Sequence, residues 1–295
     1  HADGISVDAA GNVYVTGVSN ASWGTPVRAF SSGTDSFVAK LDAGTGALTW
    51  NTFLGASGND YGYGVTSDSS GNVYVAGSSA STWGTPLRAI SLNGDGFAAR
   101  LTSAGALSWN TFLGGAGADG AEGIALDGSG NVYVGGFSSA AWGSPVRAYG
   151  GNFDMTVTRL SGAGALSWNT FVGGAGYEVA EALAVDAAGN AVIVGKGDGG
   201  SFGTPVDAYA ASHDAIVAKV GNTGTLTWNT FAGGADVDEA YGVALDGSGN
   251  AWVTGRSYTS WGNPWRAFGG GGLIPDGWVL QLSHTRERQW NAFLG

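Results

Sequence analysis

The chain has 295 residues, of which 55 are glycine and 43% are hydrophobic, and this apolar content separates it from disordered glycine-rich sequences. Its net charge of −11 argues against nucleic acid as a partner, because phosphate binding needs clustered Lys and Arg. There is no cysteine for disulfides or thiolate chemistry, and no run approaches the roughly 20 apolar residues of a transmembrane helix.

Four strand-like runs follow one another in the first part of the chain: Gly4 to Asp8, Asn12 to Val18, Asp35 to Leu41, and Leu48 to Leu54. The first two are joined by a short Asp-to-Asn turn, which is typical of a hairpin. The connection between the second and third runs is much longer than an ordinary hairpin loop. We refer to this connection as the long loop of a repeat.

This group of four runs recurs five times. A Gly-Asn pair that opens the second run lies at Gly11, Gly71, Gly130, Gly189 and Gly249. A Trp-Asn pair in the fourth run lies at Trp50, Trp109, Trp168, Trp228 and Trp290. Tandem units of four strands are typical of β-propellers. We therefore predict an all-β fold, a five-bladed β-propeller with four antiparallel strands per blade.

The five blades form a single domain with boundaries at about 1–58, 59–117, 118–176, 177–236 and 237–295. We expect blade five to pack against blade one and close the ring, and an open β-solenoid is the alternative fold. The recurring Trp of the fourth run should pack between neighbouring blades, where its burial contributes on the order of 2 to 3 kcal/mol.

The motifs Gly-Asn-Val-Tyr-Val, Asp35-Ser36-Phe37-Val38-Ala39-Lys40-Leu41 and Trp-Asn-Thr-Phe-Leu-Gly resemble the SBBP-type β-propeller repeat of bacterial proteins. The resemblance covers nearly the whole chain, although the Trp-Gly-Thr-Pro of the long loop and blade four depart from it. It implies an exported, often cell-surface protein, and it carries no catalytic residues to transfer.

The long loops carry a Trp followed five residues later by an Arg, a pair suited to stacking on a sugar and bonding its hydroxyls. The candidate ligand-binding residues are Trp23, Arg28, Trp83, Arg88, Trp142, Arg147, Trp261 and Arg266. The alternative is architectural: each Trp anchors its loop, and each Arg pairs with the Asp that opens the third run.

Blade four breaks this pattern, because Phe202 replaces the Trp and Asp207 replaces the Arg. Two carboxylates without a cation repel one another. Asp207, His213 and Asp214 are therefore candidate metal ligands, with neutral drift of an exposed loop as the alternative.

The first run of each repeat carries Asp3, Tyr63, Glu122, Glu181 and Tyr241 at equivalent positions, near the expected channel. If the protein is an enzyme, Asp3, Glu122 and Glu181 are the catalytic candidates, since glycoside hydrolysis uses two carboxyl groups. The turn from Asp127 to Asn131 resembles part of a calcium loop but lacks its later ligands. We expect no cofactor, with calcium as the alternative.

These observations favour an exported, non-enzymatic binding or scaffold propeller, extracellular or at the cell surface, whose ligand is a glycan or a protein. The sharper form is a carbohydrate-binding protein that uses the long loops. The alternatives are a polysaccharide-acting glycosidase or lyase with channel carboxylates, and a self-associating surface-layer or filament subunit.

Overall fold

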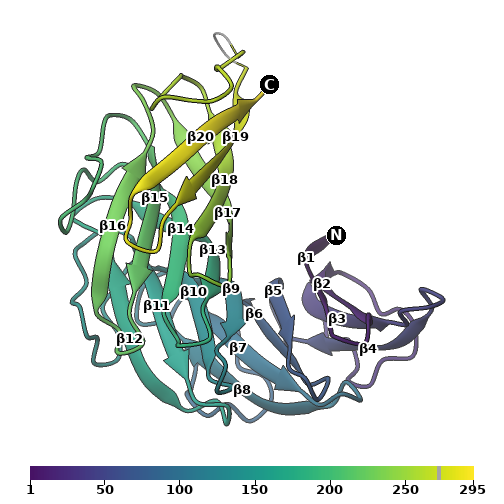
Figure 1. Cartoon of the computed structure of the whole chain (residues 1–295). Helices are drawn as coiled ribbons and strands as arrows, with labels where there is room; N and C mark the ends of the chain where they lie inside the picture. Colours follow the sequence, from purple (N-terminus) through teal and green to yellow (C-terminus); the bar gives the residue numbers. More distant parts are fainter. Residues whose placement is uncertain (271–273) are drawn as a thin grey trace.

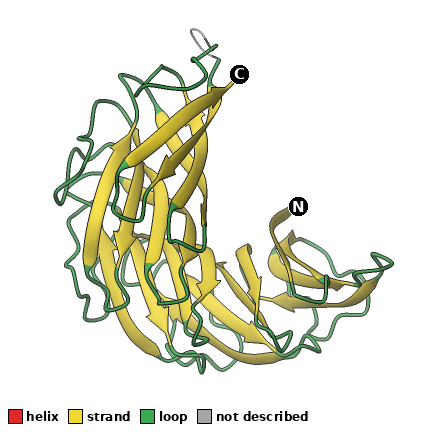
Figure 2. Ribbon diagram, viewed as in Figure 1, coloured by secondary structure: helices red, strands yellow, loops and turns green. Residues whose placement is uncertain are grey.

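The computed structural model describes residues 1–270 and 274–295, which form strands, turns and loops (Figure 2). No helix long and apolar enough to cross a membrane occurs among these described residues. Twenty strands form five separate sheets of four strands each, and within every sheet the strands follow one another in chain order.

Blade one consists of β1 (Ala2–Val7), β2 (Val13–Ser19), β3 (Asp35–Leu41) and β4 (Leu48–Leu54). Blade two consists of β5 (Asp60–Ser67), β6 (Val73–Ser79), β7 (Asp95–Leu101) and β8 (Leu107–Leu113). Blade three consists of β9 (Asp119–Leu126), β10 (Val132–Ser138), β11 (Asp154–Leu160) and β12 (Leu166–Val172). Blade four consists of β13 (Glu178–Val185), β14 (Ala191–Gly197), β15 (Asp214–Val220) and β16 (Leu226–Ala232). Blade five consists of β17 (Asp238–Leu245), β18 (Ala251–Ser257), β19 (Asp276–Leu282) and β20 (Arg288–Leu294).

All neighbouring strands within a blade are antiparallel, so the predicted propeller of five four-stranded blades is confirmed. The first strand of each blade contacts the first strand of the next, from β1 through β5, β9 and β13 to β17. These inner strands line the concave side of the molecule, and the fourth strands lie on its convex side (Figure 1).

The blades form an open arc. Figure 1 shows blade one and blade five at its two ends, with a gap between them. Among the described residues, no strand of blade five packs against blade one. The expectation that blade five closes the ring on blade one is therefore wrong for this structure. The rotation from each blade to the next is too small for five blades to complete a turn.

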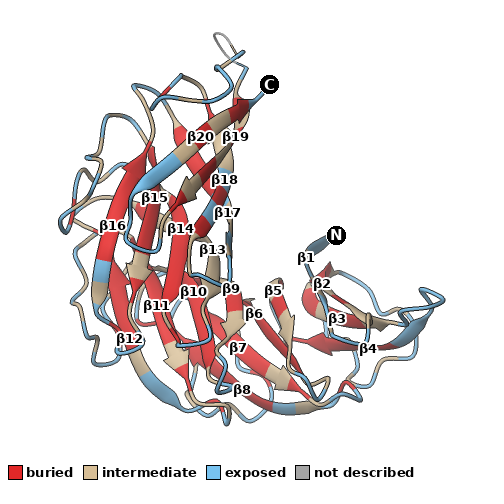
Figure 3. Ribbon diagram, in the orientation of Figure 1, coloured by how far each residue is buried: buried red, intermediate tan, exposed pale blue. Residues whose placement is uncertain are grey.

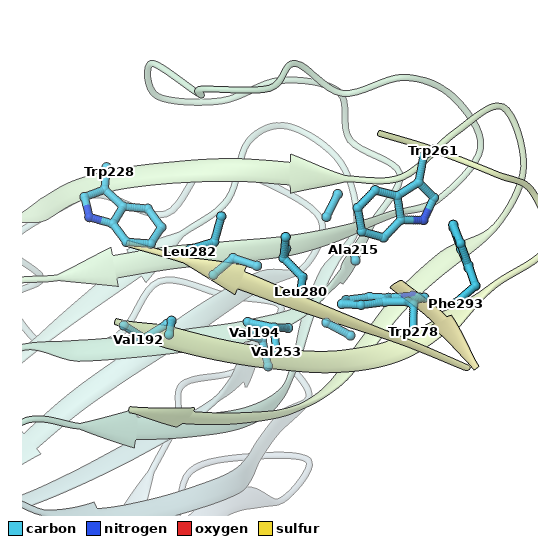
Figure 4. Packing of buried hydrophobic residues seen from close by; sticks show 14 residues of the cluster. Val192, Val194, Ala215, Trp228, Val253, Trp261, Trp278, Leu280, Leu282 and Phe293 are labelled. Atoms are coloured by element: carbon cyan, nitrogen blue, oxygen red, sulfur yellow. The ribbon is translucent and has the colours of Figure 1, made fainter. Parts of the chain in front are cut away.

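The cores lie between the blades, where side chains from two neighbouring sheets interdigitate. Figure 4 shows the core between blades four and five, with Trp228 of β16 at one end and Leu282 and Leu280 of β19 toward its middle. At the other end of this core, Trp261 packs edge-on against Trp278, with ring centroids 5.3 Å apart. Low charge and high aromatic content in the sequence are explained by these interblade layers.

The tryptophan of the fourth strand joins one blade to the next, as predicted. Trp50 is 8% exposed, and its indole Nε1 donates to the carbonyl of Ser103 at 3.0 Å. Ser103 belongs to the turn between the third and fourth strands of blade two, which we call the receiving hairpin. A Cβ on Gly105 of this hairpin would lie 2.8 Å from the Trp50 ring. Glycine is required at this position for two reasons: a side chain would meet the Trp50 ring, and the backbone φ is +81°.

Candidate functional site on the inner surface

The tryptophans of the long loops point into the protein. Trp83, Trp142 and Trp261 are between 3% and 6% exposed. Trp83 packs edge-on against Phe97 and Phe112, with ring centroids 5.1 and 5.9 Å apart. In each loop, an Asn of the fourth strand donates to the carbonyl of this residue, as Asn110 does to Trp83 at 2.8 Å. These contacts anchor the loop on its own blade.

The arginines of the long loops also have partners inside the protein. Arg147 donates from Nη1 to the Phe171 carbonyl at 3.0 Å and from Nη2 to the Gly173 carbonyl at 2.7 Å. Its guanidinium lies over the Phe202 ring of the next blade, 5.8 Å from the centroid. The same pair of carbonyl contacts is made by Arg28, Arg88 and Arg266.

The predicted pairing of these arginines with the Asp that opens the third strand is seen as an ion pair between Arg88 and Asp95, 3.8 Å apart. The dominant partners of the four arginines are backbone carbonyls instead. Ligand binding by the eight Trp and Arg side chains stays a prediction, and their internal contacts lead us to look for the site elsewhere.

A pair of buried carboxyl groups lies at each junction between blades. Asp35 and Asp60 are both fully buried. A Cβ on Gly55 would lie 2.6 Å from an oxygen of each, so the two groups face the same small space. Burial raises the pKa of Asp60 to about 6, and the charge of Asp35 adds to the rise. The guanidinium of Arg28 lies near enough to oppose it.

In blade four this arrangement lacks its guanidinium, as the sequence predicted, because Asp207 stands in its place. Asp207 pairs with Arg288 of blade five at 3.6 Å, and His213 lies 3.7 Å from Asp198. Asp214 is buried separately and accepts the Ala210 amide at 2.7 Å. Within residues 1–270 and 274–295, no three acidic, His or Cys side chains gather as metal ligands. Asp207, His213 and Asp214 therefore have separate partners.

The turns between the first and second strands are capped by their own Asp. Asp127 accepts the backbone amides of Ser129 and Asn131 through Oδ1, each at 2.9 Å, and the Asn131 side chain through Oδ2. Hydrogen bonding of this kind accounts for the Asp-Gly-Ser-Gly-Asn sequence as a turn. The absence of a cofactor stays a prediction.

The five channel positions share a feature that the sequence did not reveal. In every blade, the register of the first strand shifts across this one residue, so each of the five is the extra residue of a β-bulge. The bulged residues are Asp3, Tyr63, Glu122, Glu181 and Tyr241. A bulge re-aims the side chain it carries and is common beside functional sites.

Two further positions per blade accompany the bulge on the inner surface. One lies two residues earlier on the first strand, and the other is its neighbour on the second strand. In blades two to five these neighbours are Tyr61 and Ser78, Gly120 and Phe137, Val179 and Lys196, and Glu239 and Arg256. The adjoining glycine of the second strand is the same in all five blades, whereas these positions differ in each. Variation on a repeated scaffold marks this surface as the candidate site.

Between blades two and three the inner surface is hollowed. The hollow has a volume of about 240 Å³ and is lined by Asn59, Tyr61, Tyr63, Ser78, Glu122 and Phe137. The rings of Tyr61 and Tyr63 are stacked, with centroids 6.2 Å apart and planes 5° from parallel. Both tyrosines and Phe137 are half-buried, so each keeps part of its surface open. An aromatic wall thus faces polar groups across a small open space.

Two acidic residues line this hollow, the buried Asp119 and the bulged Glu122. Burial raises the pKa of Glu122 to about 7, and the negative charges of Glu181 and Asp3 add to the effect. Of the three predicted carboxylates, Glu181 and Asp3 therefore each act on Glu122 through their charge. At neutral pH, Glu122 is partly protonated and able both to donate and to accept hydrogen bonds.

Over blades four and five the same surface carries a network of ion pairs. Lys196 lies 3.3 Å from Glu181 and 3.0 Å from Glu239, and Glu239 also accepts bonds from Arg256 and Tyr241. Burial alone would raise the pKa of Glu239, but these donors outweigh it and lower the pKa. The network spans two blades and fixes the charged half of the surface.

Sequence reasoning found the bulged residues but missed Tyr61, Phe137 and the second-strand neighbours. The available signal was their variation between blades at a position next to an invariant glycine. Their proximity depends on the bulge and on interblade geometry, neither of which the repeat pattern specifies.

Comparison with known proteins supports the repeat. Residues 49–84 match the family model of the SBBP β-propeller repeat, which confirms the resemblance seen in the sequence. No curated protein matches the chain. The solved structure of Kuenenia stuttgartiensis hydrazine synthase is similar, with a TM-score of 0.56 and 12% identity over 96% of this chain. This chain covers 62% of that chain, and at such identity the likeness is one of fold alone.

Proposed function

We propose that this chain is a non-enzymatic binding propeller that holds a neutral glycan in the hollow between blades two and three. The observation that carries this proposal is the stacked pair of Tyr61 and Tyr63, half-open to the hollow beside Glu122. The ring faces of a sugar are apolar and its edge carries hydroxyl groups, so an aromatic wall opposite polar side chains suits both.

The polar lining favours a neutral ligand over a charged one. Asn59 and Ser78 each offer a donor and an acceptor. Glu122, with a pKa of about 7, offers either a proton or an accepting oxygen without a fixed full charge. The ion pairs of blades four and five leave their charges matched within the protein, so they add little attraction for an ionic ligand at this surface.

The proposed location is outside the cell, at or near its surface. Support comes from the resemblance to SBBP-type repeats, matched at residues 49–84. Extracellular glycans and surface proteins are the partners that such a location offers. Detection of the native protein in a surface or secreted fraction of its source cells tests this part, and its restriction to the cytosol would contradict it.

A glycan array followed by titration calorimetry tests the binding site. We expect Tyr61→Ala and Tyr63→Ala each to weaken binding about tenfold, because each removes a stacking contact of roughly 1.5 kcal/mol. Tyr258→Ala is the matched control, since this tyrosine lies on blade five beside Arg256. No binding to any glycan, or equal losses in all three variants, would refute the proposal.

Glycoside hydrolysis is the second candidate function, and the raised pKa of Glu122 favours it. A carboxyl group with a pKa of about 7 has the protonation state of a general acid. Glu181, which pairs with Lys196 at 3.3 Å, would supply the second carboxylate. The charge of Asp3 also raises the pKa of Glu122.

Turnover assays on polysaccharides separate the two functions. Hydrolysis requires that Glu122→Gln and Glu181→Gln each abolish product release while binding persists. Turnover that survives in the double variant would remove these residues from the chemistry. Binding without turnover in the wild-type protein would leave the non-enzymatic function.

A further inference from the structure

Blade one has an apolar face that the corresponding faces of the inner blades do not expose. Ile5 and Val7 of β1 are 71% and 60% exposed. At the position of Ile5, blades two and three carry Val65 and Ile124, each only 8% exposed. The inner residues are covered by a preceding blade. We call this surface, formed by Ile5, Val7 and the turn at Gly46, the blade-one face. No residue of β1 is buried (Figure 3).

Blade five has the opposite face open. Trp252 of β18 is 37% exposed, whereas Tyr14 and Tyr74 at the same position are 0% and 3% exposed. Leu294 of β20 is 59% exposed, and Leu54 at its position is fully buried. We call this surface, formed by Trp252, Trp290 and Leu294, the blade-five face.

The two faces hold the two halves of the contact that joins neighbouring blades. Gly105, Gly164 and Gly224 in the receiving hairpins of blades two to four each meet a tryptophan of the preceding blade. Gly46 is the same glycine in blade one, with φ +68° and no atom within 4 Å of a Cβ built on it.

Among the described residues, no hairpin of another blade receives Trp290. It is stacked on Trp265, with ring centroids 4.8 Å apart and planes 15° from parallel. Trp265 is itself 76% exposed. Blade five therefore presents the tryptophan and blade one presents the glycine hairpin that would receive it.

We infer that the blade-five face of one molecule docks on the blade-one face of a second copy of this chain. The junctions between blades one and two, two and three, and three and four supply the template, because each joins a tryptophan to a glycine hairpin. In blade five Arg286 stands at the glycine position. The two faces of one molecule lie at opposite ends of the arc (Figure 1). Closing them on each other would require a change of rotation at the internal junctions.

This contact joins unlike surfaces, so each copy retains one free face of each kind. Such head-to-tail contacts continue into larger rings or filaments. The net charge of −11 on each copy opposes association at low ionic strength, and salt screens that repulsion. Association should therefore strengthen as salt is added.

Sedimentation velocity over a range of concentrations tests the inference. We expect Trp290→Ala and Leu294→Asp each to weaken association at least 30-fold, since both lie at the centre of the proposed contact. Leu92→Ala is the control, because Leu92 is 74% exposed in the long loop of blade two. Equal behaviour of all three variants would overturn the inference, and so would a wild-type protein that stays monomeric at millimolar concentration.

Fluorescence transfer identifies the partner. The chain has no cysteine, so Thr45→Cys and Gln289→Cys place single labels beside the two faces. Transfer between separately labelled chains on mixing is expected. Transfer within one doubly labelled chain at high dilution would instead mean that the ring closes on itself, which contradicts docking of a second copy. The hollow between blades two and three takes no part, so glycan binding and association succeed or fail separately.

Discussion

Replacement of Asp238 by Asn should stabilise the protein at alkaline pH. Asp238 is fully buried, and a Cβ on Gly233 would lie 2.6 Å from its Oδ2 and 2.8 Å from Oδ1 of Asp214. Burial raises the pKa of Asp238 to about 6 from 3.8, and the charge of Asp214 adds to the rise against hydrogen bonds from Ser257 and Gly234. Asp207 occupies the position of the guanidinium that other blades place nearby.

The sign follows from the direction of this shift. A raised pKa means that the folded protein holds the Asp238 proton more tightly than the unfolded chain. The resulting stabilisation is complete below pH 3.8 and is lost as the pH rises through about 6. A pKa raised from 3.8 to about 6 corresponds to about 3 kcal/mol. Asn stays neutral at every pH, so Asp238→Asn should gain up to about 3 kcal/mol at pH 8 and almost nothing near pH 4.

Urea unfolding of both proteins at pH 4 and pH 8 measures the difference directly. Comparison of variant with wild type cancels the titration of groups that do not interact with Asp238. Glu287→Gln removes the same charge from an exposed hairpin and should change stability by less than about 0.5 kcal/mol at either pH. A variant that is less stable than wild type at pH 8, or shifted equally at both pH values, would refute the reasoning.

Four further substitutions test the architecture. Gly105→Val should lower the free energy of unfolding by about 3 kcal/mol or more, because its side chain would meet Trp50. Gly46→Val should lower it by only about 1 to 2 kcal/mol, through its positive φ alone. Equal losses in thermal unfolding would contradict the interblade contact. Trp83→Ala should lose about 3 to 5 kcal/mol in urea unfolding, as a core residue does, and a neutral effect would count against its burial. Arg147→Ala should lose about 2 to 3 kcal/mol by leaving two carbonyls without a donor, and unchanged stability would show that water replaces the guanidinium.

Much of the scaffold was predictable because each repeat carries local signals. The Asp127 turn was recognisable from its turn-forming residues, and in the structure Asp127 Oδ1 accepts the backbone amides of Ser129 and Asn131. The spacing of Trp50 and its equivalents identified an interblade residue, and Trp50 reaches Ser103 of the next blade. Strand alternation and turn chemistry act over a few residues, so one sequence suffices to read them.

The open arc and the hollow could not be predicted in the same way. Closure depends on small rotations that accumulate over four junctions, and repeats of similar sequence do not reveal their size. The stacking of Tyr61 on Tyr63 depends on the β-bulge at Tyr63, and no residue of the sequence pattern predicts that bulge. The long-loop residue Trp83 offered an aromatic signal as strong as these tyrosines, yet its side chain fills a core.

A crystal structure of the protein with its tightest-binding glycan tests the central claim most directly. We expect a sugar ring against Tyr61 and Tyr63, with hydroxyl groups bonded to Glu122. A glycan bound on the long loops, or on the turns between the first and second strands, would contradict the assignment of function to the bulged inner surface.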